Sequence, residues 1–296
     1  QILPEQIHIL NVAFLVPTMR REFGGCAGNI AYNLNLLGGD PIIMATVGGD
    51  AGSYYDQLAK YEISTDHIRE LPEAFTAQAM ITTDRDNNQI TAFHPGAMSE
   101  SHLNHVADVV AHRASRGLNI PKIAIVAPDG RQGMIEHCQQ LADAKIDFIF
   151  DPGQGLPMFD GKDLVGFIEQ ATYVAVNDYE GEMLSQRTGL SLKAISERVE
   201  ALIVTKGSQG AEVHTKGKQI DIPVVPVEKA IDPTGCGDAF RGGLLFGLEQ
   251  GFDWETTGRL ASLMGSIKIA SQGPQNHQPS REDIQSQFKK AFNYSF

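Results

Sequence analysis

The sequence has little cysteine, no long apolar run and no excess of positive charge. Its three cysteines, Cys26, Cys138 and Cys236, are too few for a disulfide framework and suit a reducing cytoplasm. No apolar run approaches the roughly 20 residues of a membrane span. The formal net charge of −12 leaves no basic stripe to neutralise a nucleic-acid backbone. We therefore expect a cytoplasmic protein with neither a membrane nor a nucleic acid as partner.

Several familiar catalytic loops are also missing. The chain has no Gly-x-x-x-x-Gly-Lys-Ser/Thr loop, no Asp-Phe-Gly, no His-Arg-Asp and no clean Gly-x-Gly-x-x-Gly. These absences exclude the P-loop and protein-kinase layouts and argue against a dinucleotide oxidoreductase. What is present is globular: 296 residues, 42% hydrophobic and 20% charged, enough for one large core or a core with a small appendage.

The most informative stretch is Asp-Pro-Thr-Gly-Cys-Gly-Asp-Ala-Phe-Arg-Gly-Gly, residues 232–243. Three small residues, Gly235, Cys236 and Gly237, allow backbone N–H groups to approach an oxyanion closely. Apolar residues with helical spacing follow, so the loop is predicted to open a helix, where free N–H groups favour negative charge. Asp238 is then suited to remove a proton from a substrate hydroxyl while the N–H groups hold a transferred phosphoryl group. The alternative is a capping Asp after a glycine turn.

Short apolar runs alternate with helical patterns along most of the chain. Strands are predicted over 42–47, 123–127, 148–150, 173–176 and 202–205, and helices over 27–37, 52–61, 134–144, 179–188 and 192–200. This alternation is typical of an α/β protein with a parallel sheet covered on both faces. Four polar residues each follow a strand and should therefore meet at the carboxyl edge, where ligands bind: Asp129, Asp151, Asn177 and Thr205.

Two regions depart from this rhythm. Residues 7–16 alternate in part, and residues 77–83 are predicted to pair with 89–93 as a β-hairpin across a polar turn. Downstream, residues 232–270 are predicted to form two consecutive helices. A break at Gly273-Pro274 follows, and a final helix begins near Ser280.

Four segments, in order along the chain, resemble the ribokinase/PfkB family of ATP-dependent small-molecule kinases. They are the double-glycine motif at 24–29, the Asn-x-x-Glu element at 177–180, the strand-turn at 205–210 and the signature at 232–245. The resemblance covers nearly the whole chain. It implies one kinase domain over 1–296, built as a ribokinase-like three-layer sandwich. The central sheet would be mostly parallel and flanked by helices, and residues 7–16 and 77–93 would form a small β-sheet lid.

The resemblance also implies roles for individual residues. Asp238 is the base, and Gly235, Cys236 and Gly237 form the anion hole. Gly24, Gly25 and Asn29 hold the acceptor, and Asn177 and Glu180 organise Mg²⁺, through water. ATP is contacted by Asn177, Thr205, Gly207, Gly210 and Arg241. Each motif also has a plainer interpretation: a helix start at 24–29, a capping box at 177–180 and a hairpin turn at 205–210.

Within the family, the segments around Gly24 and 78–98 look most like bacterial nucleoside kinases of the adenosine type. Gln78, His94 and Asp129 are the side chains expected to contact the nucleoside. For His94, a purely structural place at the hairpin end is an equal alternative. The next hypothesis is a sugar kinase like ribokinase or fructokinase, and a third is a non-catalytic nucleotide-binding regulator.

Two further expectations concern reactivity and assembly. Cys236 at a helix N-terminus is predicted to have a depressed pKa. The 77–93 hairpin is too small to bury its own apolar side chains, which predicts a lid-mediated homodimer. Only 23 residues precede Gly24, and the acidic strand that grips substrate hydroxyls in the resembled family has no counterpart there. We therefore expect a missing N-terminal segment. The acceptor, oligomeric state and regulation stay open.

Overall fold

A six-stranded sheet forms the centre of the molecule, in a computed structural model that describes residues 15–83 and 89–296. Its strands run in the order β10-β9-β8-β7-β6-β5. Their bounds are β5 Ile123–Val126, β6 Asp147–Phe150, β7 Tyr173–Asn177, β8 Ala201–Thr205, β9 Ala211–Thr215 and β10 Lys218–Ile222. Strands β5 to β8 pair in parallel, while β9 and β10 add an antiparallel hairpin at one edge. The mostly parallel sheet is therefore confirmed.

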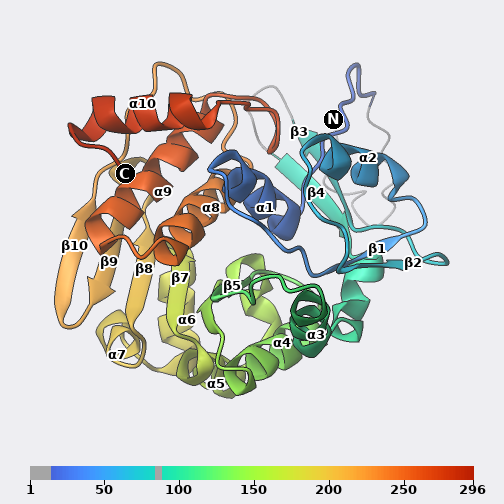
Figure 1. Cartoon of the computed structure of the whole chain (residues 1–296), viewed down its shortest axis with the longest axis horizontal. Helices are drawn as coiled ribbons and strands as arrows, with labels where there is room; N and C mark the ends of the chain where they lie inside the picture. The colour runs from blue at the N-terminus through green and yellow to red at the C-terminus, as the bar shows by residue number, and fades with distance from the viewer. Residues whose placement is uncertain (1–14, 84–88) are drawn as a thin grey trace, which may run out of the picture.

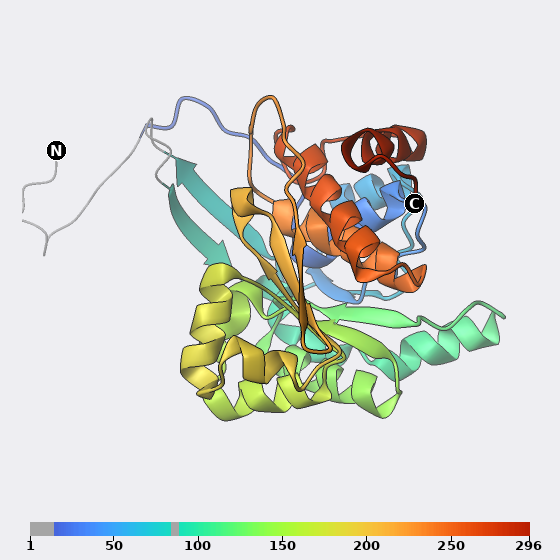
Figure 2. The same cartoon turned by 90° about the vertical axis from the view of Figure 1, so that its left-hand side faces the viewer.

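Helices cover both faces of this sheet, giving the three layers visible in Figures 1 and 2. One layer contains α1 Cys26–Leu36, α8 Cys236–Glu249, α9 Trp254–Ile269 and α10 Arg281–Phe292. The other contains α3 Val106–Ser115, α4 Arg131–Asp143, α5 Gly161–Gln170, α6 Asp178–Thr188 and α7 Leu192–Ser196. This is the three-layer sandwich that the family resemblance predicts.

Alternation along the buried strands divides the core into two halves. In β6, Phe148 and Phe150 pack into the cluster formed with α4, α5 and α6, while Ile149 between them packs against α1 and α8. The strands are apolar on both faces because both faces are covered. Their continuous apolar runs are the reason that four of the five strands predicted from the sequence form this sheet.

The fifth predicted strand is placed differently. Residues 42–47 were expected among the strands of a parallel sheet. The observed strand, β1, spans Ala45–Gly48, and its partner among the described residues is β2, Ile68–Leu71, in a parallel pair. Helix α2, Gly52–Lys60, connects them. The two form a small sheet apart from the six-stranded one, so periodicity predicted the strand but not the sheet to which it belongs.

A hairpin of β3 (Gln78–Thr83) and β4 (Gln89–His94) projects from the body (Figure 2). This confirms the predicted hairpin. Its proposed companion strand over 7–16 lies almost entirely outside the described residues. Short 3₁₀ segments complete the chain: η2 Gly96–Leu103, η3 Gly153–Met158 and η4 Gly207–Gln209.

Close helix packing at α8 brings the two glycine motifs together. A Cβ on Gly242 would lie 2.8 Å from Asn33 Cβ and 3.2 Å from the Ile30 carbonyl oxygen, so only glycine lets α8 lie this near α1. Both helices begin on the same side of the sheet, and Figure 1 shows them side by side. The packing therefore determines which side chains meet at their N-termini.

Candidate active site

Asn29 and Asp238 join the two distant motifs directly. Asn29 Nδ2 donates to Asp238 Oδ2 over 2.8 Å, although 209 positions separate them in the chain. Asn29 lies in the first turns of α1 and is buried, and Asp238 lies in the first turn of α8. The carboxylate is thus fixed at the N-terminus of α8, as the sequence predicted.

The environment of Asp238 is crowded with charge. Burial raises the pKa of Asp238, the Asn29 amide opposes that rise, and the nearby Asp151 adds to it. A partly desolvated carboxylate with a raised pKa is a stronger base than an exposed one. The N-cap of α8 is Gly235, so Asp238 is not the capping residue of the alternative interpretation.

The anion loop preceding α8 differs in one detail from the prediction. Gly235 adopts φ 82° at the N-cap, which favours glycine. Of the three expected N–H donors, that of Cys236 donates to the Pro233 carbonyl over 3.1 Å. Within residues 15–83 and 89–296, the N–H groups of Gly235 and Gly237 have no acceptor. The loop therefore offers these two donors in the observed conformation, and Cys236 is already occupied.

The prediction that Cys236 has a depressed pKa is wrong. Burial raises the pKa of Cys236 to about 11, and the Lys268 ammonium nearby opposes that rise only in part. Cys26, at the start of α1, also has a raised pKa because of its burial and the negative charge of Asp238. Both residues do lie beside the site, but as protonated thiols.

Carboxylates gather at the carboxyl edge of the sheet, as expected. Asp151, after β6, forms a two-pronged ion pair with Arg241: Nε to Oδ2 and Nη2 to Oδ1, each 3.0 Å. The charges of Asp129, Asp151 and Asp238 all act on the Cys26 thiol, which lies among them. Burial raises the pKa of Asp129 to about 6. The rim therefore concentrates negative charge around one guanidinium.

Arg241 was predicted to contact ATP phosphates. Two of its nitrogens are held by Asp151, and its Nη1 lies 3.7 Å from where a Cβ on Gly237 would stand. The guanidinium thus lies under the anion loop. Burial opposes its charge, but the pKa of Arg241 is raised overall by Asp151, Glu180 and Asp238.

Asn177 and Glu180 form a complete capping box at the start of α6. Asn177 Oδ1 accepts from the Glu180 N–H over 2.7 Å, and Glu180 Oε2 accepts from the Asn177 N–H over 2.8 Å. The structural alternative for this motif is therefore confirmed. Burial raises the pKa of Glu180, and Asp151 adds to the rise.

No group of three or more His, Cys, Asp or Glu with metal-binding geometry occurs in the part of the chain that the structure describes. Mg²⁺ commonly takes only one or two carboxylates, with water and phosphate oxygens completing its shell. The partly buried Glu180 carboxylate fits that demand, since one of its oxygens is used by the cap and its charge lies beside Asp151 and Arg241. The residues present therefore suit a water-bridged ion and not an all-protein cage.

The 205–210 segment is the turn between β8 and β9, as the structural alternative had it. Thr205 Oγ1 donates to the Val176 carbonyl oxygen, Gly207 begins η4, and Gly210 follows its last residue. Lys206 is paired with Glu212. Thr205 and Asn177 are register partners on neighbouring strands, so both predicted nucleotide-binding residues end at one edge of the sheet.

The predicted acceptor residues fall in two groups. Among the residues that the structure describes, a Cβ on Gly24 or Gly25 would meet no atom within 4 Å, so neither glycine is packed against them. Gln78 and His94 are register partners at the base of the hairpin. Gln78 Nε2 donates to Asp50 Oδ2 over 3.1 Å, and His94 stands edge-on to Phe75.

Several residues beside the site carry no sequence signal. Gln275 donates to Asn29, and the Tyr54 hydroxyl donates to the Gly24 carbonyl oxygen. The fully buried Lys268 donates from Nζ to the Asp232 and Ser271 carbonyls over 2.7 and 3.0 Å. Asp151 was placed on the rim by its position after a strand, but its pairing with Arg241 was not foreseen. A lone Gln, Tyr or Lys resembles any surface residue in a sequence.

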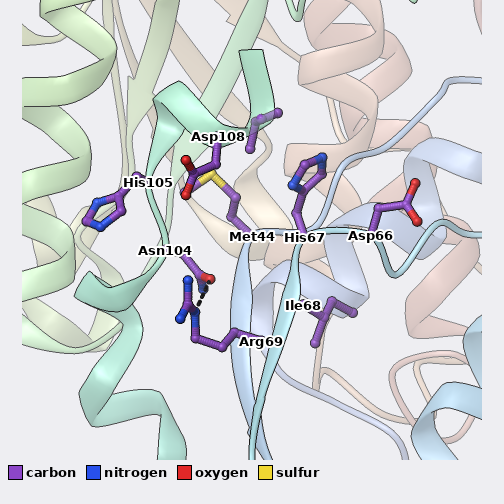
Figure 3. Close-up of a pocket in the computed structure, with 9 residues that line it drawn as sticks. Met44, Asp66, His67, Ile68, Arg69, Asn104, His105 and Asp108 are labelled. Atoms are coloured by element: carbon purple, nitrogen blue, oxygen red, sulfur yellow. Dashed lines mark hydrogen bonds between the residues drawn. The ribbon is translucent and has the colours of Figure 1, made fainter. Parts of the chain in front are cut away.

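A cavity of about 280 Å³ lies elsewhere, beside β2 and the start of α3 (Figure 3). Its lining includes His67, Arg69, Asn104 and His105, and it shares no residue with the predicted site. The candidate active site is instead the open rim where α1, α8 and the strand ends meet.

Comparison with known proteins identifies the family. The chain matches the model of the pfkB family carbohydrate kinases over residues 2–281. It belongs to that family. Its predicted class, a phosphotransferase with an alcohol group as acceptor, and its ribokinase-like fold are thereby confirmed.

Relatives within the family include nucleoside kinases. The Methanocaldococcus jannaschii nucleoside kinase is 32% identical over 283 residues, covering 95% of this chain and 90% of the relative. The Burkholderia thailandensis nucleoside kinase in complex with inosine is 56% identical, with a TM-score of 0.90 over 98% of this chain and 93% of that one. Its complex with ADP-inosine gives 57% identity and a TM-score of 0.88, covering 99% and 90%.

The described part of the chain has no helix of the length and apolar character needed to cross a bilayer.

Proposed function

We propose that this pfkB-family kinase transfers the terminal phosphoryl group of ATP to a primary hydroxyl of a nucleoside. The observation that carries the proposal is the Asn29–Asp238 hydrogen bond, because it places the candidate base at the junction of the acceptor glycines and the anion loop. The relatives described as nucleoside kinases, one of them bound to inosine, favour a nucleoside over a free sugar.

In this mechanism Asp238 accepts the proton of the attacking hydroxyl. The free N–H groups of Gly235 and Gly237, at the α8 N-terminus, donate to the transferred phosphoryl oxygens. Arg241, held under this loop by Asp151, contributes positive charge without needing to reorganise. Catalysis is then mostly positioning and electrostatic stabilisation.

ATP and Mg²⁺ are the proposed cofactors. Asn177, Thr205, Gly207 and Gly210 lie where the nucleotide would extend along the strand ends, and Glu180 would hold Mg²⁺ through water. The bound ion would neutralise charge on the phosphate oxygens. The binding of ADP-inosine by the Burkholderia kinase supports the nucleotide assignment.

We propose that the ribose lies against Gly24 and Gly25, which the described residues leave uncovered. His94 and Asp129 are proposed to bind the nucleobase. Asn29 and Gln78, also predicted to touch the acceptor, are already bonded to Asp238 and Asp50. We assign Asn29 chiefly to holding the general base, Asp238, in position.

We also propose a cytoplasmic location, because the three cysteines are free thiols, as is usual in a reducing compartment.

The test is an ADP-release assay with ATP and Mg²⁺, in which inosine and adenosine are compared with ribose and fructose. We expect the better nucleoside to exceed either sugar at least about tenfold in kcat/KM, or roughly 1.4 kcal/mol. Comparable turnover of a free sugar would leave the sugar-kinase alternative standing. No ADP release with any acceptor would favour the non-catalytic regulator.

The hairpin supports a lid-mediated homodimer. Register places Phe93 beside Ala79 on one face and Ile90 beside Thr82 on the other, and both apolar side chains are exposed, by 55% and 72%. Two apolar faces need two partners, and we propose the bound nucleoside for one and a second lid for the other. Sedimentation at micromolar concentration should show a dimer. Alternation along β4 puts His94, which we propose to contact the nucleoside, on the same face as Ile90, so Phe93→Lys should dissociate the dimer and Ile90→Lys should not. A wild-type monomer, with and without ligand, would contradict the proposal.

A further inference from the structure

Gln275 lies in the loop between α9 and α10, far in sequence from every motif of the site. It is only 3% exposed, and its Nε2 donates to Asn29 Oδ1 over 2.9 Å and to Tyr54 Oη over 3.1 Å. Tyr54 Oη in turn donates to the Gly24 carbonyl oxygen over 2.6 Å. The Gln275 amide therefore bonds both to Asn29, which donates to Asp238, and to Tyr54, which donates to Gly24.

The contact with Asn29 matters because an amide side chain is nearly symmetric in shape. Whether its oxygen or its nitrogen faces Asp238 depends on what bonds to the other end. The Tyr54 hydroxyl gives its proton to the Gly24 carbonyl oxygen, so it can only accept from Gln275, and this turns the Gln275 nitrogen toward Tyr54 and Asn29. That nitrogen is a donor and requires the Asn29 oxygen on its own side. The Asn29 nitrogen is then the atom that faces Asp238, where it donates to Oδ2.

We infer that Gln275 is a positioning residue for phosphoryl transfer, which orients the Asn29 amide so that Asp238 is held as an ionised base. The inference rests on the proposed function, because it takes Asp238 as the base. The loop containing Gln275 is not part of any recognised motif here. It acts on the chemistry only through Asn29 and, by way of Tyr54, on the acceptor glycines.

The surroundings make this orientation consequential. The groups facing Asp238 are Asp151 after β6, Arg241 on α8, Cys26 on α1 and, further out, Tyr54 on α2. Only Arg241 is positive, and Asp151 already holds two of its nitrogens. If the Asn29 oxygen faced Asp238 instead, two acceptors would confront each other, and the pair could bond only with Asp238 protonated. A protonated Asp238 cannot take the hydroxyl proton.

The decisive variant is Gln275→Glu, which keeps the shape of the side chain and replaces its donor with an acceptor. A carboxylate here attracts the Asn29 nitrogen and turns the amide around. We expect kcat to fall about 10- to 100-fold, the usual effect of losing a hydrogen bond to a charged group. We also expect the acidic limb of the kcat–pH profile to move to higher pH, with KM for ATP changed less than about threefold.

The matched control is Gln278→Glu, the same change three positions along the loop. Gln278 is exposed, and its Nε2 donates to the Tyr61 hydroxyl, outside the network. This variant should keep the wild-type kcat and pH profile. If it loses as much kcat as Gln275→Glu, the effect belongs to added charge or loop disturbance, and the inference is wrong.

A double-mutant cycle tests whether Gln275 acts through Asn29. Gln275→Glu should cost little further activity in an Asn29→Ala background, because the amide it orients is gone; strictly additive losses would overturn the inference. Asp238→Asn, measured alongside, separates the two claims. Near-wild-type activity of Asp238→Asn would refute the proposed base itself. If Asp238→Asn loses activity while Gln275→Glu keeps the wild-type kinetics, only the role of Gln275 is refuted.

Discussion

Arg241 and Asp151 form a buried fork in which two guanidinium nitrogens meet two carboxylate oxygens, with both side chains less than 10% exposed. The pair ties α8 to the end of β6 directly under the anion loop. Removing one partner leaves a buried charge unpaired, which costs far more than exchanging both for apolar groups.

We therefore expect Arg241→Met to lower the free energy of unfolding by about 3–5 kcal/mol. The double variant Arg241→Met with Asp151→Leu should recover a large part of that loss, while its kcat stays low because the positive charge under the loop is missing. Urea unfolding and steady-state kinetics measure the two effects. A double variant as unstable as the sum of its single variants would contradict this account of the pair.

Lys268 anchors the anion loop from the other side. Its ammonium group is fully buried on α9 and donates to the Asp232 and Ser271 carbonyls, and burial lowers its pKa. Lys268→Met keeps the apolar stem but leaves the Ser271 carbonyl without this donor and the Asp232 carbonyl with only the weak Cys236 thiol donor, at about 1–3 kcal/mol for each lost bond. We expect lower stability, measured by urea unfolding, and a kcat reduced more than KM for the nucleoside. Unchanged kcat in a folded variant would show that the loop holds its shape without this ammonium.

His277 should make stability depend on pH. Its ring is buried, its Nε2 lies 2.7 Å from Asn33 Oδ1, and its Nδ1 has no hydrogen-bond partner among residues 15–83 and 89–296. Burial lowers the pKa of His277 from 6.5 to about 4. The unfolded chain thus binds more protons than the folded one between these values, so the free energy of unfolding should rise with pH across that window, by up to about 3 kcal/mol.

Asp129 acts in the opposite direction over much of the same window. Its raised pKa, about 6, means that the folded state binds more protons there, so its contribution to stability falls as pH rises. Comparing wild type with His277→Gln, by urea unfolding at about pH 4.5 and about pH 7.5, isolates the histidine. The variant should lose less stability on acidification than the wild type does. Equal losses would rule out His277 as a source of the pH dependence.

The sequence predicted the strand ends well because each buried strand is a short apolar run that stops at a polar residue. Asp151 and Asn177 could be placed on one rim for that reason alone. It could not predict that β1 leaves the main sheet, since its apolar pattern is the same in either sheet. Nor could it predict that the Cys236 N–H group donates to the Pro233 carbonyl oxygen, because that bond depends on how the loop turns.

The contacts that complete the site depend on tertiary packing. Asn29 reaches Asp238 because Gly242 allows α1 and α8 to approach, and no local pattern carries that information. Gln275 is still harder to find, because a buried glutamine looks in sequence like an exposed one. The prediction of a depressed Cys236 pKa was wrong because it considered the helix N-terminus and left out the burial of the thiol, which raises that pKa.

The most direct test of the central claim is the Asp238→Asn variant. The amide keeps the size of the carboxylate and removes its ability to accept the hydroxyl proton, so ATP affinity and folding should be retained. We predict a loss in kcat of about 10²–10⁴ with the best nucleoside, the usual contribution of a positioned base. Turnover within a few-fold of wild type would contradict the assignment of Asp238 as the base.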